Sequence, residues 1–274
     1  MFARTMIAAL LTALIWSVAS FAQPVGSYTM QPPASAPIGN SLIFTAASSQ
    51  YLSKTGNTSA SKTTLTVGGW VKLSSATLST SATFYLAGDG TSNNFVLMSL
   101  NSGSVLLDIF VSGSEIGKLH IPSVSIADTN WHHILYAIDT TQATSTNRLK
   151  GYLDGTLLSY STTTFPTQNA NLSTALADAY YFGNVFSNLG TTYFDGKMAQ
   201  VYYIDGQQLT PTSFITGTPG VPKTYSGTYT GHFDFFLPFS NGTSTTTLGA
   251  DSSGESNNWT LNNMTTANQS SDYP

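Results

Sequence analysis

The sequence predicts an all-β fold in which two antiparallel sheets pack face to face as a jelly-roll sandwich. From residue 41 onward, short runs of β-branched and aromatic residues are separated by polar turn clusters, and several runs alternate apolar and polar residues with period two. Two runs end in Asp-Gly pairs, in "LDGT" (153–156) and "IDGQ" (204–207), which are typical of hairpin turns. About ten such strands at regular spacing indicate a sandwich or jelly roll.

The N-terminal residues 1–22 have the layout of a secretory signal peptide. One positive charge at Arg4 precedes an apolar run over about residues 6–18, and Ser20 and Ala22 stand at the −3 and −1 positions of the expected cleavage site. We therefore expect a secreted protein, or one at the surface of a cell or virion. The apolar run is shorter than the roughly 20 residues of a spanning helix, so we expect no membrane span after cleavage. An uncleaved anchor or a buried hydrophobic arm is the alternative.

The rest of the chain divides into three parts. Residues 23–40 are rich in Pro, Ser and Gly and are expected to form an irregular lead-in. Residues 41–215 form the predicted sandwich domain, whose strand-length runs are SLIFTAA, TLTVGGWVKL, ATFYLAG, NFVLMSL, SVLLDIFV, KLHIPSV, HHILYAID, RLKGYLDG, AYYFGN and AQVYYIDG. Residues 216–274 contain a Pro/Gly linker, the aromatic run HFDFFLPF and a tail of Ser, Thr and Asn. This irregular extension has too few apolar residues to fold alone, so we expect it to lie on the sandwich or to order against a neighbouring molecule.

The composition excludes several classes of function. Charged residues make up 8% of the chain, where roughly 25% is ordinary. The net charge is −4 and there is no basic run. Nucleic-acid binding is driven by the release of counterions when basic side chains contact phosphates, and this chain has no cluster of basic side chains to do so. We therefore expect no nucleic-acid partner. The chain has no cysteine, which excludes disulfides and thiolate metal sites.

The histidine pair in "TNWHHILYAIDTT" (129–141) is predicted to be structural. Neighbouring residues of a strand point to opposite faces, so His132 and His133 cannot bind one metal ion from one face. Each is expected among apolar neighbours of its strand. His120 and His232 have no partner at metal-ligand spacing.

Catalysis finds little support in the residues, and we predict that the protein is not an enzyme. Glycosidases of this general fold need two carboxylates about 5 to 9.5 Å apart, yet Glu115 and Glu255 are the only glutamates and neither stands beside another acid at useful spacing. No Gly-x-Ser-x-Gly elbow, phosphate loop or histidine-based zinc motif is present. The alternative needs acids that are distant in sequence, and Asp108, Asp139 and Asp195 are the first candidates.

Five segments, taken in order, carry a family resemblance: SLIFTAASSQYLSKT, TLTVGGWVKL, NWHHILYAID, GYLDGTLLS and FDGKMAQVYYIDGQQLTPTSF. Over about residues 38–214 they resemble the laminin-G-like or concanavalin A-like jelly-roll domain. That family has an opening Phe with a Tyr-Leu, an aliphatic strand ending in Trp, a Trp-His strand and a Leu-Asp-Gly hairpin. A closing Phe-x-Gly strand then leads into a Leu-Thr/Ser-Pro turn. The resemblance implies a jelly-roll sandwich of the same kind.

The C-terminal part carries a second, narrower resemblance. The segments FDGKMAQVYYIDGQQLTPTSF, YSGTYTGHFDFFLPFSN and LGADSSGESNNWTLNNMTTANQSSDYP resemble the end of bacteriophage and prophage structural proteins of the tail or virion surface. Residues 251–254 and 257–260, together with Asp272 and Pro274, match the Asp-Ser-Ser-Gly-x-x-Asn-x-Trp-Thr run and the terminal Asp-x-Pro of those proteins. The signal peptide departs from that pattern, which suggests a host-encoded, exported relative.

Ligand binding is the function that the residues favour. Lectins of the jelly-roll type place ligands on rim loops or the concave sheet, with Asp and Asn for hydroxyl groups and an aromatic ring for the apolar face of a sugar. Two loops offer this mixture, and the candidate residues are Asp89, Asn93, Asn94, Asn184, Phe186, Asn188, Tyr193 and Asp195. Neutral hydrogen-bonding groups beside aromatic rings suit uncharged glycans. The alternative is that these are ordinary turns, since Asn, Asp and Gly fill turns for backbone reasons alone.

No cofactor is predicted, and the resemblance leaves calcium open. Some laminin-G-like domains hold calcium through loop acids and carbonyls, and Asp89 with Asn93 or Asn94 would be the first donors here. Hard cations take about six to eight oxygens, which this sequence does not specify. Ala199 and Gln200 also stand where relatives often carry an acidic pair.

We therefore predict a non-enzymatic exported or particle-surface protein whose lectin-like domain binds a surface polysaccharide or glycoprotein, in adhesion or recognition. The C-terminal extension is expected to mediate self-assembly or to pack the chain end onto the domain. The main alternative is a structural subunit of a phage virion, tail or extracellular assembly that binds no sugar. Large exposed apolar patches would favour that alternative, whereas a polar concavity studded with aromatic rings would favour the lectin.

Overall fold

The computed structural model describes residues 39–56, 61–76, 82–101, 104–122, 126, 128–172, 174, 179–189, 192–217, 220–229, 231 and 233–274. The predicted signal peptide (1–22) and nearly all of the predicted lead-in (23–40) lie outside these residues. His232 and the side chain of Asn188 also lie outside what is described. The described residues belong to one compact unit.

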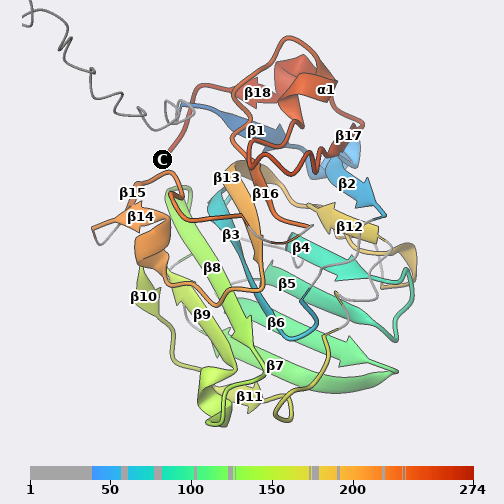
Figure 1. Cartoon of the computed structure of the whole chain (residues 1–274). Coiled ribbons are helices and arrows are strands. Elements are labelled where there is room, and N and C mark those ends of the chain that lie inside the picture. Colours follow the sequence, from blue (N-terminus) through green and yellow to red (C-terminus); the bar gives the residue numbers. More distant parts are fainter. Residues whose placement is uncertain are drawn as a thin grey trace, which may run out of the picture. The chain divides into compact units, whose positions relative to one another are not determined.

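Two eight-stranded sheets form a sandwich, and their strands pair antiparallel throughout the described residues, as the sequence predicts (Figure 1). Sheet A contains, in spatial order, β10 (Thr156–Leu157), β9 (Leu149–Leu153), β8 (Trp131–Asp139), β3 (Thr64–Leu73), β13 (Gly196–Asp205), β1 (Ser41–Phe44) and β18 (Gln269–Ser270), with β16 (Phe235–Leu237) also paired to β13. Sheet B contains β11 (Thr162–Thr164), β7 (Ser114–Pro122), β6 (Ser104–Val111), β5 (Phe95–Asn101), β4 (Ala82–Gly88), β12 (Ala179–Phe182), β2 (Tyr51–Thr55) and β17 (Thr260–Asn262).

The remaining regular elements are short. A two-stranded ribbon pairs β14 (Ile215–Thr216) with β15 (Val221–Pro222). Helical structure in the described part of the chain comprises α1 (Thr245–Leu248) and the 3₁₀ turns η1 (Ala46–Ser48), η2 (Ser145–Asn147), η4 (Ser187–Leu189), η5 (Pro211–Ser213) and η6 (Thr266–Asn268). None of these described helices has the length and hydrophobicity needed to cross a membrane.

The main hydrophobic core lies between the two sheets, and the period-two pattern of the strands builds it. In β5, Val96, Met98 and Leu100 point into this core, whereas Phe95 and Leu97 lie on the opposite face of sheet B. A strand places successive side chains on opposite faces, so the alternation read from the sequence directly assigns the inward set.

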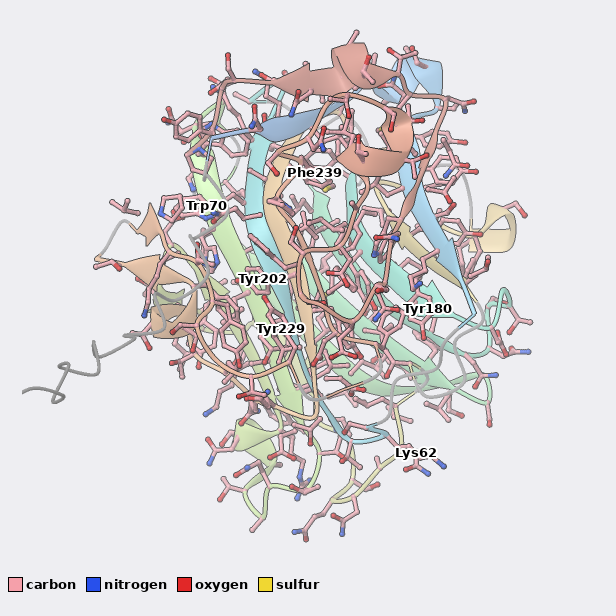
Figure 2. All side chains as sticks on the ribbon, turned by 45° about the horizontal axis from the view of Figure 1, so that its top comes forward. Lys62, Trp70, Tyr180, Tyr202, Tyr229 and Phe239 are labelled. Atoms are coloured by element: carbon pink, nitrogen blue, oxygen red, sulfur yellow. The ribbon has the colours of Figure 1, made fainter. Side chains whose placement is uncertain are left out.

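A second apolar layer covers the face of sheet A that points away from sheet B. Trp70 and Tyr202, on the neighbouring strands β3 and β13, pack there with Phe214 and Tyr229 of the segment that follows β13. Figure 2 labels Trp70, Tyr202 and Tyr229 of this layer. The rings of Tyr202 and Phe214 stack with centroids 3.8 Å apart. Strand β3 is therefore covered on both faces, which explains its nearly continuous burial.

One of the two predicted Asp-Gly hairpins forms and the other does not. Asp154 and Gly155 join β9 to β10 with positive φ angles of 49° and 82°, as a tight hairpin requires. The prediction of a hairpin at residues 204–207 is wrong. Gly206 follows the end of β13, and its N–H donates to the carbonyl of Thr64 (3.0 Å), but the next strand, β14, pairs with β15. The chain leaves sheet A at this turn and supplies the apolar layer over its outer face.

The C-terminal residues 216–274 lie on the sandwich, which is one of the two roles expected for them. Strand β16 pairs with β13, β17 with β2 and β18 with β1, so the extension adds strands to both sheets (Figure 1). Trp259 is 3% exposed, and its ring centroid lies 4.9 Å from that of Phe182 and 5.0 Å from that of Phe235. The extension thus completes the main core although most of its residues are polar.

The polar side chains of residues 251–260 hold this loop in shape. The carboxylate of Asp251 accepts hydrogen bonds from the backbone N–H groups of Phe236 and Asn257, both at 2.9 Å. The backbone N–H of Asp251 in turn donates to Asn258 Oδ1 at 2.8 Å. These bonds fasten the loop to β16 and hold the tryptophan that follows in the core.

Candidate functional site

The first predicted loop, between β4 and β5, uses its polar side chains to shape its own turn. Oδ1 of Asp89 accepts hydrogen bonds from the backbone N–H (2.9 Å) and hydroxyl (2.6 Å) of Thr91, and Oδ2 accepts from Asn94 Nδ2 (2.8 Å). Burial raises the pKa of Asp89, but these hydrogen bonds outweigh it and lower the pKa below its ordinary value. Asn94 Oδ1 accepts a further hydrogen bond from the backbone N–H of Ser112 (2.8 Å), between β6 and β7. A role for Asp89 and Asn94 in ligand binding stays a prediction, because their polar atoms are engaged in these contacts.

The calcium expectation rests on the same loop. Asn93 is exposed, and its carbonyl oxygen accepts a hydrogen bond from the N–H of Gly113 (2.9 Å). Within the described part of the chain, no three His, Asp or Glu side chains come together in a group that could hold a metal ion. Calcium binding at Asp89 and Asn93 therefore remains a prediction from the resemblance.

The second predicted loop, between β12 and β13, places its candidates in different surroundings. Asn184 Oδ1 accepts a hydrogen bond from the backbone N–H of Val185 (2.8 Å) and so shapes its own turn. Asp195 accepts hydrogen bonds from the backbone N–H of Ala46 (3.1 Å) and from the hydroxyl of Ser74, and it lines a cavity described below. Asp195 thus joins this loop to the segments that follow β1 and β3.

Two other candidates of this loop enter one aromatic cluster. Tyr193 lies beside Tyr51 of β2, with ring centroids 6.3 Å apart, and Tyr51 lies 5.8 Å from Tyr181 of β12. Phe186 packs edge-on against Tyr181 at 5.6 Å and 83°. Tyr51, Tyr181 and Tyr193 are partly exposed, whereas Phe186 is buried. We call the three exposed tyrosines the tyrosine platform.

Strand alternation places the tyrosine platform on the face of sheet B that points away from the main core. Leu52 and Phe182 point into the core between the sheets, so Tyr51 and Tyr181, which precede them in sequence, point outward. Tyr181 packs there with a smaller apolar cluster that includes Leu86. This cluster supports Tyr181 from beneath.

The groups around the platform are neutral hydrogen-bonding groups. None of the three phenol hydroxyls is bonded to a described residue. Asn262 borders Tyr51, and its Nδ2 donates to the hydroxyl of Ser53 (2.8 Å). Burial raises the pKa of Tyr181, and the neighbouring Tyr51 adds to the effect, so this hydroxyl stays protonated at neutral pH. Tyrosine combines an apolar ring with a polar tip, so the platform can cover an apolar ligand face and bind hydroxyl groups at its edge.

Sequence reasoning finds Phe186 and Tyr193 but misses Tyr51 and Tyr181. The alternation of Tyr51 with the core residue Leu52 could have identified Tyr51 as outward-facing. Tyr181 lies within the run "YYF", where three aromatic residues in succession hide the period-two signal. The convergence of the two strands with the 183–196 loop depends on the fold, and no local pattern encodes it.

The paired histidines are structural residues of strand β8, as predicted, and His133 has the apolar neighbours expected for it. It is fully buried, its ring lies 5.2 Å from that of Trp70, and its Nε2 shares a hydrogen bond with the hydroxyl of Tyr202 (2.7 Å). Burial lowers the pKa of His133 to about 3. The side chain is therefore neutral at physiological pH and acts as a packing residue.

The expectation of apolar neighbours is wrong for His132. Its Nδ1 lies 2.7 Å from Asp154 Oδ2, and its Nε2 lies 3.0 Å from Asp128 Oδ1. Burial lowers the pKa of His132, but the hydrogen bonds to Asp154 and Asp128 outweigh it and raise the pKa above its ordinary value. His132 ties the start of β8 to the hairpin that follows β9, which is a structural role with a pH dependence.

The fold brings together two acids that are separate in the sequence. The pairing of β6 with β7 lets Lys118 contact both Glu115 and Asp108. Burial raises the pKa of Asp108, and Lys118 opposes this shift. The three acids considered for catalysis, Asp108, Asp139 and Asp195, lie in separate networks in which none shares a hydrogen-bond partner with another.

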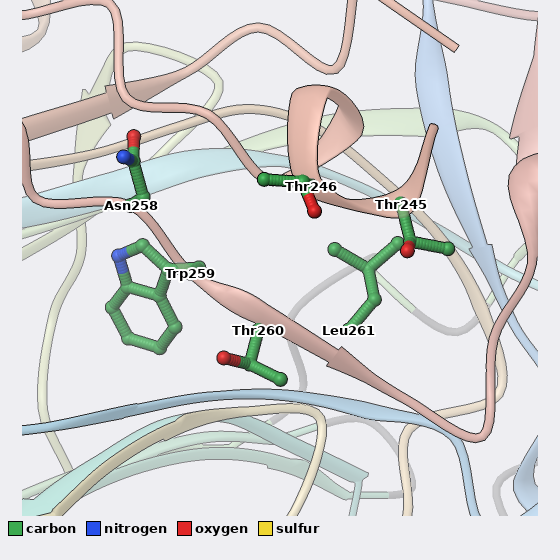
Figure 3. A pocket seen from close by; sticks show the side chains of 6 residues that line it. All are labelled: Thr245, Thr246, Asn258, Trp259, Thr260 and Leu261. Carbon is green, nitrogen blue, oxygen red and sulfur yellow. The ribbon is translucent and has the colours of Figure 1, made fainter. Parts of the chain in front are cut away.

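A small pocket of about 190 Å³ lies beside α1 in the C-terminal extension (Figure 3). It is lined by Thr245, Thr246, Asn258, Trp259, Thr260 and Leu261. Small-molecule sites usually measure about 300–1,000 Å³. This pocket is smaller, and its tryptophan belongs to the main core, so we regard it as a packing feature.

Comparison with known proteins gives one family and several distant structural likenesses. The profile of the Concanavalin A-like lectin/glucanases superfamily matches residues 46–213, and no curated protein matches the sequence significantly. The structure is similar to that of a Bacteroides ovatus protein described as carbohydrate-binding, with 12% identity and a TM-score of 0.52, over 82% of this chain and 58% of that chain.

Two further likenesses have lower TM-scores. A native heptameric SAP-like pentraxin from Limulus polyphemus has 17% identity and a TM-score of 0.45, over 64% of this chain and 79% of that one. Domains LG4-5 of the mouse laminin α1 chain have 16% identity and a TM-score of 0.46, over 70% and 47% of the two chains. The matched regions span only about half of the laminin and Bacteroides chains. At these identities the Bacteroides likeness shows the fold alone.

Proposed function

The chain belongs to the concanavalin A-like lectin/glucanases superfamily, and from this premise we propose that it is a non-enzymatic protein that binds surface polysaccharides or glycoproteins through the tyrosine platform. The observation that carries the proposal is the convergence of Tyr51, Tyr181 and Tyr193 on an outward sheet face, with centroid spacings of 5.8 and 6.3 Å. Adhesion or recognition is the proposed role.

The chemistry of the platform favours an uncharged glycan. A sugar ring has an apolar C–H face and a rim of hydroxyls, and tyrosine rings with free hydroxyls match both features. The polar groups beside Tyr51, on Ser53 and Asn262, are neutral. A charged sugar would gain no ion pair from these groups, so stacking and neutral hydrogen bonds would supply the affinity.

Binding rather than catalysis is supported by the state of the acids. Lys118 forms ion pairs with both Asp108 and Glu115, and Asp139 and Asp195 are each engaged in turns or loop contacts. Glycoside hydrolysis needs one carboxyl group as an acid and another as a nucleophile or base. The similarity to a Bacteroides ovatus protein described as carbohydrate-binding agrees with a binding role.

We further propose that residues 1–22 are removed on export and that residues 216–274 serve mainly to close the sandwich formed by residues 41–215. The large hydrophobic side chains exposed in the described part of the chain are Leu157, Val221 and Tyr273, on three separate segments. Single exposed apolar residues are normal on a protein surface, so this distribution does not single out a structural subunit of a virion or tail.

A glycan array probed with the mature chain from Gln23, with and without calcium, tests the proposal. We expect selective binding to uncharged glycans that is lost in Tyr51→Ala and Tyr193→Ala variants and kept in Tyr273→Ala, a matched change at a tyrosine outside the platform. Truncating a central aromatic contact typically costs about 2 kcal/mol or more, or about thirtyfold in affinity. No hit, together with an oligomer in solution, would instead support the structural subunit.

A further inference from the structure

A polar cavity of about 340 Å³ lies on the outer face of sheet A, where β1, β3 and β13 meet the C-terminal tail. Its volume falls within the roughly 300–1,000 Å³ of small-molecule sites. Four charged residues line it: Lys72, Asp195, Lys197 and Asp272. This cavity is distinct from the tyrosine platform, which lies on sheet B.

The charged groups of the cavity form a fixed arrangement. Lys72 and Lys197 stand directly opposite each other on β3 and β13, and like charges in this position repel. Asp272 lies between them, with Oδ2 accepting from Lys72 Nζ (2.9 Å) and Lys197 Nζ (2.6 Å) and Oδ1 accepting from Trp131 Nε1 (3.0 Å). Both carboxylate oxygens are therefore held by protein donors, and the tail closes one side of the cavity.

The cavity keeps hydrogen-bonding capacity after these contacts. Each lysine ammonium has three donors, and contacts with described residues use one of them on Lys72 and one on Lys197. The hydroxyls of Thr45 and Thr129, which also line the cavity, are bonded to no described residue. Ile43 and Leu73 contribute apolar lining. The lining thus combines spare donors, spare acceptors and apolar carbon.

The charge balance indicates which ligand fits. Two ammonium groups face two carboxylates, so the formal charges of the lining cancel. An anionic ligand would approach Asp195 and Asp272 as well as the lysines and would gain little. A hydroxyl group can donate to a carboxylate and accept from an ammonium at the same time. A neutral ligand with several hydroxyls can therefore use both kinds of group.

We propose that this cavity binds a neutral, polyhydroxylated ligand, of the size of one or two sugar units. The lysine donors and the carboxylates would bind its hydroxyls, and Ile43 would face its apolar side. The proposal does not rest on the tyrosine platform, and either site can exist without the other.

Trp131 provides a local reporter, because its indole N–H contacts Asp272 at the cavity wall. Beyond the predicted signal peptide, the tryptophans stand at positions 70, 131 and 259, so the indole region of a ¹H–¹⁵N spectrum holds three signals. A Trp131→Phe variant assigns the relevant one. The ¹⁵N-labelled mature chain is titrated with methyl β-glucoside, methyl β-galactoside and myo-inositol, to about 50 mM, which saturates a site with a Kd of about 1 mM. Methyl β-glucuronide serves as the anionic counterpart.

We expect at least one neutral probe to shift the Trp131 signal saturably while the signals of the other two tryptophans stay in place. Thr129→Val, a change at an exposed residue, should weaken this binding at least about fivefold, and the matched exposed change Thr156→Val should not. Tyr193→Ala should leave it unchanged, which separates this site from the platform. The proposal is overturned if no neutral probe shifts the signal, or if methyl β-glucuronide binds more tightly than methyl β-glucoside.

Discussion

Replacing Trp259 by alanine tests whether the polar C-terminal extension is part of the main core. The side chain is 3% exposed and packs against Phe182 and Phe235, with centroids at 4.9 and 5.0 Å. A buried tryptophan removes about 150–250 Å² from water, which corresponds to about 4–6 kcal/mol as an upper bound. Measured losses for such truncations are about 3–5 kcal/mol. We expect Trp259→Ala to lower the free energy of unfolding by that amount.

A second substitution separates packing from hydrogen bonding at the same position. The buried Nε1 of Trp259 has no hydrogen-bond partner among the described residues, so Trp259→Phe breaks no bond and loses only part of the packed volume. We expect a loss of about 1–2 kcal/mol for this change.

Urea denaturation of the mature chain, followed by far-UV circular dichroism, measures both variants without relying on tryptophan fluorescence. Tyr273→Ala, at a residue 49% exposed in the same extension, is the matched control and should change stability by no more than about 0.5 kcal/mol. A loss below about 1 kcal/mol for Trp259→Ala would refute the reasoning, because the extension would then contribute little to the core.

Three further predictions concern strain, pH and charge. Gly196→Ala should destabilise the fold by more than about 1 kcal/mol, because φ is +150° and an added Cβ would lie 2.1 Å from the carbonyl oxygen of Lys72. The control is Gly39→Ala, whose Cβ meets nothing within 4 Å. Equal denaturation midpoints for the two variants would contradict this prediction. The pKa of His132 is raised by its two aspartate partners despite the opposing effect of burial. Its stabilisation is therefore complete below about pH 6.5 and is lost as pH rises through the raised folded pKa. His132→Gln should lose more thermal stability at pH 5.5 than at pH 9, and a pH-independent loss would rule this out. Asp272→Asn removes two partly exposed ion pairs, with Lys72 and Lys197, worth about 0.2–1 kcal/mol each. Urea denaturation should therefore show a loss of stability that shrinks in about 1 M salt. A loss of stability that does not depend on salt would contradict a contribution from these ion pairs.

The sandwich is predictable from the sequence because its signals are local. The alternation of Val96 and Met98 with Phe95 and Leu97 assigns the two faces of β5 without any knowledge of its neighbours. The Asp154–Gly155 turn is equally local. The turn at Gly206 carries the same signal, but the chain beyond it covers sheet A instead of pairing with β13, and this choice depends on the apolar layer around Tyr202.

The site is less predictable because it depends on register and on long-range convergence. Tyr51, Tyr181 and Tyr193 come from three separate segments, and the run around Tyr181 offers no alternation to read. The ion triad of Asp108, Glu115 and Lys118 likewise arises from the register of the β6–β7 hairpin. Composition and motif spacing do not fix that register.

A crystal structure of the mature chain with the glycan selected on the array tests the tyrosine platform most directly. We predict that a sugar ring lies over the rings of Tyr51 and Tyr193, with the Tyr181 hydroxyl within hydrogen-bonding distance, about 2.5–3.0 Å, of a sugar hydroxyl. A glycan bound at the loop around Asp89, or anywhere else with the platform bare, would contradict the proposed site.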